Sequence, residues 1–338
     1  MKTSTAERIK PVRVVAIGGG TGLSTLLREL KYHVARRRQE LQQMPIADLA
    51  AIVTVTDDGG SSGRLRREYK MLPPGDIRNC MVALSKDEEL LSSLFQYRFA
   101  SGSGLKGHSF GNLFLTALTH VTGDFTEAVR LSGQVLAIRG RIFPATMENV
   151  TLEAVQEDGS IARGETRITA SRKRIRHIRL RPRNARPLPE VLRAIEQADL
   201  ITLGPGSLYT SVIPNLLVRG VAAAIRRSRA TKVYVANLMT QPGETIGYTV
   251  ADHVRAIYEH TSPGLFDWVV INSEPISKSL LRKYGAEGAA PVAVDLDALQ
   301  KLGLRCVLDH LVDEHKVVRH DAARLSRLLL EEFVLPRQ

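Results

Sequence analysis

The stretch VRVVAIGGGTG at residues 12–22 is the part of the sequence that best indicates the fold. It opens with β-branched and apolar residues that end at Gly18, a pattern typical of a strand buried on both faces of a sheet. Glycines fill four of the five positions from Gly18 to Gly22, and apolar residues at helical spacing follow over 23–30. The stretch therefore predicts a buried strand, a glycine-rich loop and a helix.

The same alternation continues toward the C terminus. Short apolar runs, each followed by a loop rich in Gly, Pro, Asn or Ser, predict further buried strands at 49–55, 200–203, 233–236 and 268–271. Helical periodicity lies between them at 76–84, 110–118, 189–198, 213–227 and 249–260. This order predicts an α/β fold whose mostly parallel sheet carries helices on both faces.

Residues 140–185 break this alternation. Apolar and polar residues alternate on both sides of Asp158-Gly159, which predicts hairpins around a tight turn. We therefore expect a small antiparallel β subdomain inserted into the α/β domain. The α/β domain then comprises 12–139 and 186–338, and its second part ends in a helix.

The charge of the chain is unevenly distributed. Its 338 residues include 47 Lys and Arg against 35 Asp and Glu, a net charge of +12. Eleven of the basic residues and only two acidic ones lie at 163–193, so this segment alone holds +9. A solvated basic face is the simplest interpretation, with an acidic protein, a nucleic acid or an anionic membrane surface as alternative partners. The segment has no aromatic residues for base stacking, which disfavours RNA binding.

The composition also bears on the compartment. Cys80 and Cys306 are too few for a disulfide framework or a cysteine-based zinc site, which favours a reducing environment. The N terminus lacks the apolar run of a secretory signal. No apolar stretch reaches the roughly 18 residues of a membrane helix. We expect a cytoplasmic protein with no transmembrane segment.

The ligand of an open α/β sheet lies beyond the carboxyl ends of its strands, so the loops there form the candidate site. In the first loop, Gly19, Gly20, Thr21 and Gly22 would let the backbone approach a diphosphate, and the next helix would offer N–H donors. The spacing matches neither the dinucleotide fingerprint nor the P-loop. The alternative is a tight turn that needs positive φ angles.

The second loop reads TDDGGSSGR at residues 56–64. Asp57 stands where a ribose hydroxyl or a Mg²⁺ ion would be held, with Asp58 beside it. Ser61, Ser62 and Arg64 are suited to bind anionic oxygens. A solvated loop in which Asp58 caps a helix is the alternative.

Two helix starts add further candidates. In PPGDIRN at 73–79, Asp76 is placed to cap a helix, and Asn79 lies one turn further in. His108 and Asn112 are four residues apart and would share one helix face. No Ser/His/Asp or Cys/His set can be assembled with them, and His-rich metal spacing is absent.

Two later loops complete the candidate site. Gly204, Gly206 and Ser207 repeat the logic of the first loop, either as a second anion site or as the other half of one dinucleotide site. Asn237 follows another strand and offers an amide for a base or sugar.

Together these loops resemble a known family. In order and spacing they are similar to the YvcK subfamily of CofD-like proteins, also called gluconeogenesis factors. The segments that carry the resemblance are GGGTGLSTLLREL, TVTDDGGSSGRLRRE, LPPGDIRNC, KGHSFGNLFLTAL, GPGSLYTSVIPNLLV and NLMTQPGETIGYT. The resemblance covers residues 12–275, with the inserted β segment, and implies a Rossmann-like α/β fold in a cytoplasmic bacterial protein.

The resemblance also implies a function. Similar proteins are needed for normal cell shape and wall synthesis on gluconeogenic carbon sources, with a UDP-sugar such as UDP-N-acetylglucosamine as the implied ligand. An NAD-like dinucleotide would suit the same cleft. True CofD enzymes transfer a phospholactyl-type group from a GDP-activated donor to a deazaflavin alcohol with Mg²⁺. Their metal-side acid corresponds, by this resemblance, to Asp57.

We therefore expect a nucleotide-sugar-binding regulatory protein that forms a homo-oligomer. The Gly19–Gly22 loop would meet the diphosphate, and Asn112, Gly206, Ser207 and Asn237 would complete the pocket. The first alternative is a Mg²⁺-dependent transferase in which Asp57 helps to deprotonate an acceptor hydroxyl and Mg²⁺ neutralises the leaving diphosphate. The second is RNA binding through 163–193.

Overall fold

A seven-stranded parallel sheet forms the centre of the computed structural model, which describes residues 11–35, 40, 44–86, 89–315 and 317–335. Its strands follow the spatial order β10-β9-β8-β7-β1-β2-β3, and every neighbouring pair is parallel. Their bounds are β1 Val12–Gly18, β2 Ile46–Val53, β3 Arg141–Pro144, β7 Leu200–Leu203, β8 Thr231–Val235, β9 Trp268–Asn272 and β10 Arg305–Asp309. The predicted α/β fold with a parallel sheet is confirmed.

The chain reverses its direction of travel across the sheet between β1 and β7. From β1 it moves outward to β2 and β3, and it later returns beside β1 to build β7, β8, β9 and β10 on the other side. Such a reversal opens a crevice at the carboxyl ends of the two central strands. The Gly18–Gly22 loop follows β1 and the Gly204 loop follows β7, so both glycine loops lie at this crevice.

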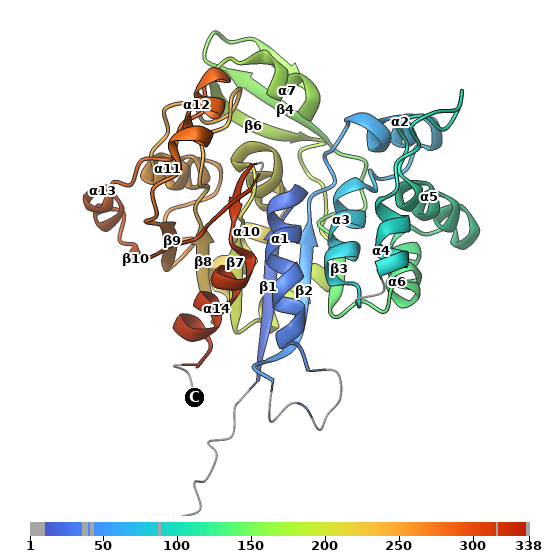
Figure 1. The fold of residues 1–338 in the computed structure, drawn as a ribbon, viewed down its shortest axis with the longest axis horizontal. Helices are drawn as coiled ribbons and strands as arrows, with labels where there is room; N and C mark the ends of the chain where they lie inside the picture. Colours follow the sequence, from blue (N-terminus) through green and yellow to red (C-terminus); the bar gives the residue numbers. More distant parts are fainter. Residues whose placement is uncertain (1–10, 36–39, 41–43, 87–88, 316, 336–338) are drawn as a thin grey trace, which may run out of the picture.

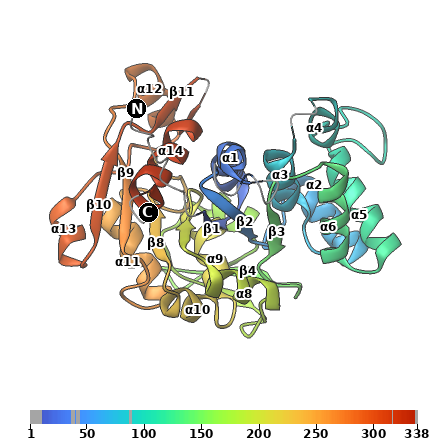
Figure 2. The same cartoon turned by 90° about the horizontal axis from the view of Figure 1, so that it is seen from below.

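Helices cover both faces of the sheet. Figure 2 shows α1 and α14 on one face and α8, α9, α10 and α11 on the other. Their bounds are α1 Gly20–Leu30, α8 Pro189–Gln197, α9 Ile213–Leu217, α10 Val221–Arg227, α11 Val250–His260 and α14 Ala322–Phe333. Leu23, Leu26, Leu27 and Leu30 bury one side of α1, which is the face that the helical spacing over 23–30 predicts.

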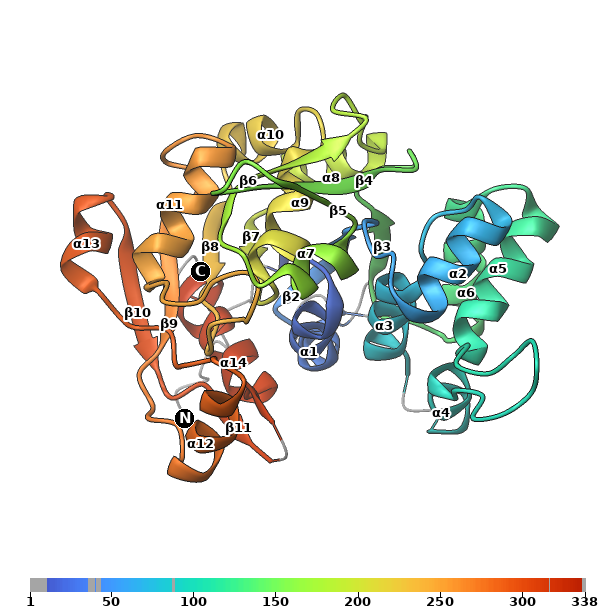
Figure 3. The same cartoon turned by 90° about the horizontal axis from the view of Figure 1, so that it is seen from above.

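A lobe of helices fills the connection between β2 and β3 and lies beside β3, as Figure 3 shows. It comprises α2 Gly60–Tyr69, α3 Gly75–Leu84, α4 Glu89–Gln96, α5 Phe110–Thr122 and α6 Phe125–Val135. One short helix follows α1, and the other short elements follow β9. These are η1 Lys31–His33, α12 Lys278–Ala286, α13 Leu296–Lys301 and the antiparallel hairpin of β11 Val312–Glu314 and β12 Val318–His320.

The predicted antiparallel insertion is present as a three-stranded sheet of order β5-β4-β6. It comprises β4 Thr151–Gln156, β5 Ile161–Arg163 and β6 Ile175–Arg181, with α7 Glu165–Ser171 between the last two. Figure 1 shows this sheet in green at the end of the parallel sheet where the glycine loops lie. Asp158 and Gly159 form the turn between β4 and β5, and Gly159 has a φ of +80°. Within the 140–185 range, Arg141–Pro144 forms β3 of the parallel sheet.

Three elements differ from the sequence prediction. The single helix expected over 213–227 is two helices, because the chain is extended at Val218 and left-handed at Gly220, which has a φ of +84°. A π-helical turn, η3 Leu208–Val212, precedes them. The predictions also miss β3 and β10. Both are edge strands, short or partly exposed along their length, so neither shows the apolar run of a buried strand.

Among the described residues, no single helix is long and apolar enough to cross a bilayer. The bent pair Leu208–Leu217 and Val221–Arg227 meets the length and composition criterion only when its two parts are taken together, at an angle of 80°.

Asn215 joins the end of β1 to the helices of the second half. Its side chain is fully buried, and Nδ2 donates to the carbonyl oxygens of Gly18, at 3.0 Å, and Ser211, at 2.7 Å. The Gly18 carbonyl also accepts from the Thr54 N–H at 3.0 Å. One carbonyl at the start of the glycine loop thus ties β1 to both neighbouring elements.

Replacement of Asn215 by Ala should lower the free energy of unfolding by about 1–3 kcal/mol, because it removes two buried hydrogen bonds. Urea denaturation measures this value. Asn184→Ala provides the control, since Asn184 is exposed and should change the stability by no more than about 0.5 kcal/mol. Equal effects of the two substitutions would contradict the role given to Asn215.

Candidate functional site

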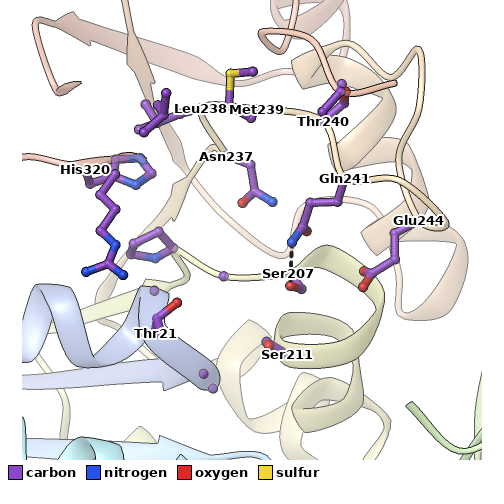
Figure 4. Close-up of a pocket in the computed structure, with 18 of the residues that line it drawn as sticks. Thr21, Ser207, Ser211, Asn237, Leu238, Met239, Thr240, Gln241, Glu244 and His320 are labelled. Carbon is purple, nitrogen blue, oxygen red and sulfur yellow. Dashed lines mark hydrogen bonds between the residues drawn. The ribbon is translucent and has the colours of Figure 1, made fainter. Parts of the chain in front are cut away.

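A cavity of about 490 Å³ opens at the carboxyl ends of β1, β7 and β8. Gly19–Gly22 form its floor, Pro205–Ser207 one wall and Asn237–Gln241 another. Figure 4 shows Thr21, Ser207, Ser211 and Asn237 gathered around it. The volume falls in the range of about 300–1,000 Å³ that is usual for small-molecule sites.

The two glycine loops approach each other backbone to backbone. A Cβ atom on Gly22 would lie 2.4 Å from the Pro205 carbonyl oxygen and 2.9 Å from the Gly206 Cα. Gly20 has a φ of +61°, a conformation that side chains disfavour. Only residues without a side chain allow this approach, which brings the N terminus of α1 to the cavity.

Asp76 lies directly beneath the first loop. Its carboxylate accepts a hydrogen bond from the Gly20 N–H, and a Cβ on Gly19 would lie 2.8 Å from Asp76 Oδ2. Burial, reinforced by the negative charge of Asp57, raises the pKa of Asp76 to about 7. The expectation that Asp76 caps its own helix is wrong, since α3 begins at Gly75 with Pro74 as its N-cap. Asp76 instead accepts a hydrogen bond from an N–H in the first turn of α1.

Glu244 occupies the corresponding place at the second loop. It is buried, accepts from the Tyr209 N–H at 3.1 Å and from Thr210 Oγ1 at 3.1 Å, and burial raises its pKa to about 7. The N–H groups that follow the Gly204 loop thus already bind a carboxylate of the chain. The second anion site considered for this loop is therefore filled at that point.

Glu165, at the start of α7, brings a third carboxylate to the cavity from the inserted subdomain. Burial raises its pKa to about 9, and the charges of Asp57, Asp76, Glu244 and Asp58 add to the effect. Among the described residues that line the cavity, Arg319 of β12 is the only Lys or Arg. An anionic ligand therefore needs these acids to be neutralised.

The hairpin that carries Arg319 is held over the cavity by α12. The Val318 N–H donates to the Tyr284 hydroxyl at 3.0 Å, and both residues line the cavity. His320 Nε2 lies 3.1 Å from the Ala236 carbonyl oxygen, which can only accept, so Nε2 carries the proton. Burial lowers the pKa of His320 to about 4, so the ring is neutral at neutral pH.

The carboxylates of Asp57 and Asp76 are suited to bind Mg²⁺. No group of three or more His, Cys, Asp or Glu side chains is arranged to hold a metal ion within the described part of the chain. Mg²⁺, however, is commonly bound by one or two carboxylates together with ligand phosphates and waters. Asp57 and Asp76 supply two hard oxygen donors, and the charge of Asp57 helps to raise the pKa of Asp76. A divalent cation would relieve that repulsion.

The predicted site residues fall into two groups. Those that line the cavity are Gly19, Gly20, Thr21, Gly22, Gly206, Ser207 and Asn237. Asp57 lies next to it, where Oδ1 accepts from the Gly59 N–H at 2.8 Å. Asp58 points away and caps α7, accepting from Thr166 N at 2.9 Å and Thr166 Oγ1 at 2.8 Å. The alternative of a capping role thus describes Asp58, although the helix it caps belongs to the insertion.

The other predicted residues bond to one another or to the backbone. Ser61 Oγ lies 3.0 Å from His108 Nδ1, and Asn112 Nδ2 donates to Ser61 Oγ at 3.1 Å and to Ser62 Oγ at 3.5 Å. All four side chains are buried. This network joins α2 to α5, and none of its residues lines the cavity.

Three further predicted residues have hydrogen-bond partners outside the cavity lining. Arg64 donates to the Lys106 carbonyl at 2.8 Å, and Asn79 Oδ1 accepts from Arg78 at 2.6 Å. Gly204 has a φ of +80°, and its N–H donates to the Ile17 carbonyl at 2.9 Å, so it joins β7 to β1.

The sequence analysis misses several side chains of the cavity, among them Glu165, Glu244, Arg319 and His320. Glu244 stands within the quoted NLMTQPGET segment, where an acid after a strand is a recognisable signal. Glu165, Arg319 and His320 give no such signal, because they come from the insertion and from the C-terminal hairpin. Their approach to the cavity depends on tertiary packing.

Comparisons with known proteins agree with this architecture. The family model described as 2-phospho-L-lactate transferase CofD matches residues 14–312. The gluconeogenesis factor of Halalkalibacterium halodurans is 48% identical over 324 residues, which cover 96% of this chain and 97% of that protein. The gluconeogenesis factor of Bacillus subtilis is 47% identical over 320 residues, covering 94% and 97%. A crystal structure of a UPF0052 family member from Bacillus halodurans superposes with a TM-score of 0.89 at 48% identity and covers 95% of this chain.

Asp76→Asn should stabilise the ligand-free protein, and by more at pH 8 than at pH 5. An unfolded Asp titrates near pH 3.9, whereas folded Asp76 titrates at about 7. Between these values the unfolded state loses its proton first, so the stability falls as the pH rises. Asparagine removes that loss. Melting temperatures at the two pH values measure the effect.

Asp297→Asn is the control for this substitution, because Asp297 is exposed on α13. Its effect on the melting temperature should be small at both pH values. A gain from Asp76→Asn that is the same at pH 5 and pH 8 would contradict the role of burial.

Proposed function

Since this chain belongs to the CofD family, as one of its gluconeogenesis factors, we propose that its cavity binds a nucleotide diphosphate compound and that the protein acts as a cytoplasmic ligand-binding regulator. UDP-N-acetylglucosamine is the first candidate ligand, and an NAD-like dinucleotide is the second. The role proposed for it is support of cell shape and wall synthesis on gluconeogenic carbon sources.

One observation carries the binding proposal. The two glycine loops meet at the reversal point of the sheet and line one cavity of about 490 Å³. In this place the diphosphate would lie against Gly19–Gly22 at the N terminus of α1, where backbone N–H groups and the helix dipole favour negative charge. Asn237 and Gln241 would face the sugar or base from the β8 side.

The acids of the cavity make binding depend on cations. Asp76, Glu165 and Glu244 have raised pKa values, so the pH decides how many of them are ionised. Each ionised carboxylate would repel a diphosphate. Mg²⁺ held by Asp57 and Asp76 would supply charge neutralisation of the diphosphate. Arg319 would meet its oxygens from the opposite side. We expect tighter binding with Mg²⁺ than without it.

The alternative function is transfer of a phospholactyl-type group, which the family model's description suggests. In that case Asp57 would accept the proton of the acceptor hydroxyl. The Ser61, Ser62, His108 and Asn112 side chains beyond Asp57 are buried and bonded to one another. Asn112 Oδ1 has no hydrogen-bond partner, but it is buried and so not open to an acceptor, which favours binding over transfer.

Arg319→Ser should weaken binding of UDP-N-acetylglucosamine about tenfold or more, because a charge-assisted hydrogen bond to a diphosphate contributes about 1.5–3 kcal/mol. Isothermal titration calorimetry with UDP-N-acetylglucosamine, NAD and GDP, each with Mg²⁺, measures the affinities. Arg282→Ser is the matched control, since Arg282 is exposed on α12 and lies outside the cavity lining. Absence of binding to every nucleotide in the unaltered protein would overturn the proposal.

Asp57→Asn separates the regulator from the transferase. For a regulator, the substitution should reduce the gain in affinity that Mg²⁺ provides, and no product should form from an activated phosphate donor in any variant. For a transferase, the unaltered protein forms product with Mg²⁺ and the variant does not. Calorimetry and phosphorus NMR give the two readouts, with Asp297→Asn as the control that retains both properties.

A further inference from the structure

The outward face of the three-stranded sheet presents an ordered row of arginines. In the register, Glu153 of β4 stands opposite Arg163 of β5 on one side and Arg179 of β6 on the other. Arg163 Nε lies 2.8 Å from Glu153 Oε1, Arg179 Nε lies 2.9 Å from Oε2, and Arg181 reaches Oε1 at 3.5 Å. Arg163, Arg179 and Arg181, together with the Glu153 that pairs with them, are called the arginine row below.

The arginine row carries more positive charge than it can balance. The Glu153 side chain is 1% exposed, whereas those of Arg163 and Arg181 are 61% and 67% exposed. Burial opposes ionisation of Glu153, but hydrogen bonds from Arg179 and Arg163 hold its pKa below the ordinary value. The Glu153 carboxylate thus holds three guanidinium groups in fixed positions at the protein surface. Groups that are already ordered lose less entropy when they bind a partner.

The rest of the basic segment is less charged than the sequence suggests. At the hairpin tip, Lys173 pairs with Asp158 at 2.6 Å and Arg174 with Glu157 at 3.4 Å. The acids of these pairs, like Glu153, precede residue 163 and are absent from the count over 163–193. The unbalanced charge therefore lies on the arginine row and on the exposed residues Arg167, Arg172, Arg176, Arg183 and Arg186.

Two aliphatic side chains, Val155 and Ile161, lie beside the arginine row on the same face. Val155 pairs with Ile161 on one side and with His177 on the other, two positions along from Glu153. Ile161 is 46% exposed. The strands β4, β5 and β6 contain no Phe, Tyr or Trp on which bases could stack. Charge next to exposed aliphatic surface suits a protein partner better than a sugar-phosphate backbone.

We propose that the arginine row and the adjoining Ile161 form a docking surface for an acidic, extended segment of a partner protein. Strands in a sheet are about 4.8 Å apart, so Arg163 and Arg179 stand on strands about 10 Å apart. In an extended segment, alternate side chains recur at about 6.7 Å on one face. Two or three alternating carboxylates would therefore span the arginine row, and guanidinium groups bind carboxylates through paired hydrogen bonds.

The test uses a fluorescein-labelled peptide of alternating Glu and Ser, about twelve residues long, with the full-length protein at physiological salt. Fluorescence anisotropy should show saturable binding. The triple variant Arg163→Ser, Arg179→Ser, Arg181→Ser should weaken it about tenfold or more. The matched triple variant Arg226→Ser, Arg227→Ser, Arg229→Ser removes the same charge from exposed positions before β8, at the amino-terminal end of that strand. It should weaken binding less than about twofold.

A second variant guards against loss of folding, because removal of Arg179 leaves Glu153 buried without its main partner. Arg163→Lys, Arg179→Lys, Arg181→Lys keeps the charge and allows pairing with Glu153. We expect it to retain the melting temperature within a few degrees and still to bind the peptide several-fold more weakly, since lysine lacks the planar fork.

Three results would overturn the proposal. Equal losses in the two Ser triple variants would mean that only the overall charge attracts the peptide. An RNA of about twenty nucleotides that binds more tightly than the peptide, with the same dependence on the arginine row, would identify a nucleic-acid surface. Absence of peptide binding to the unaltered protein would exclude a docking surface of this kind. None of these results depends on nucleotide binding in the cavity.

Discussion

The site depends on one steric constraint, the contact between two backbones at the centre of the sheet. Gly22 and Pro205 approach so closely that no Cβ could stand between them, and a Cβ on Gly19 would meet Thr54 at 2.6 Å. Parallel pairing of β1 with β7 brings the two loops to the same edge. The glycines then let α1 begin at the cavity. The anion-binding end of a helix is thus placed by the sheet and made accessible by missing side chains.

The same constraint places acids where a ligand's negative charge would lie. Asp76 binds the Gly20 N–H, and Glu244 binds the N–H groups after the second loop. Each carboxylate satisfies helix-end donors in the ligand-free protein, and burial raises the pKa of each. A diphosphate would have to replace or neutralise them. With this arrangement, we expect ligand binding in the cavity to depend on pH and on divalent cations more than it would in a pocket lined by lysines and arginines.

The sequence predicts the buried half of the fold well and the contacts across it poorly. Strands with two covered faces, such as Leu200–Leu203, show continuous apolar runs, and the loops after them are identifiable as site loops. The edge strands β3 and β10 have a weaker pattern because one side faces solvent or a loop. Among the site residues, the glycines are predictable from the strand-to-loop pattern. The bonding of Ser61 to His108 and Asn112 is not, since residues at a distance of about fifty positions must meet in space.

The inserted β subdomain connects the cavity to the arginine row. Glu165 and Thr169 of α7 line the cavity, and Asp58, the neighbour of Asp57, caps that helix through Thr166. Ile168 is the one buried residue of α7, so the helix is weakly anchored compared with β6, which buries Ile175, Ile178 and Leu180. The chain runs from α7 into β6, which bears Arg179 and Arg181. A change in charge at Asp57 would therefore act on the element that leads to the arginine row. A transferase needs no such connection, whereas a regulator requires a path from its ligand to an outer surface.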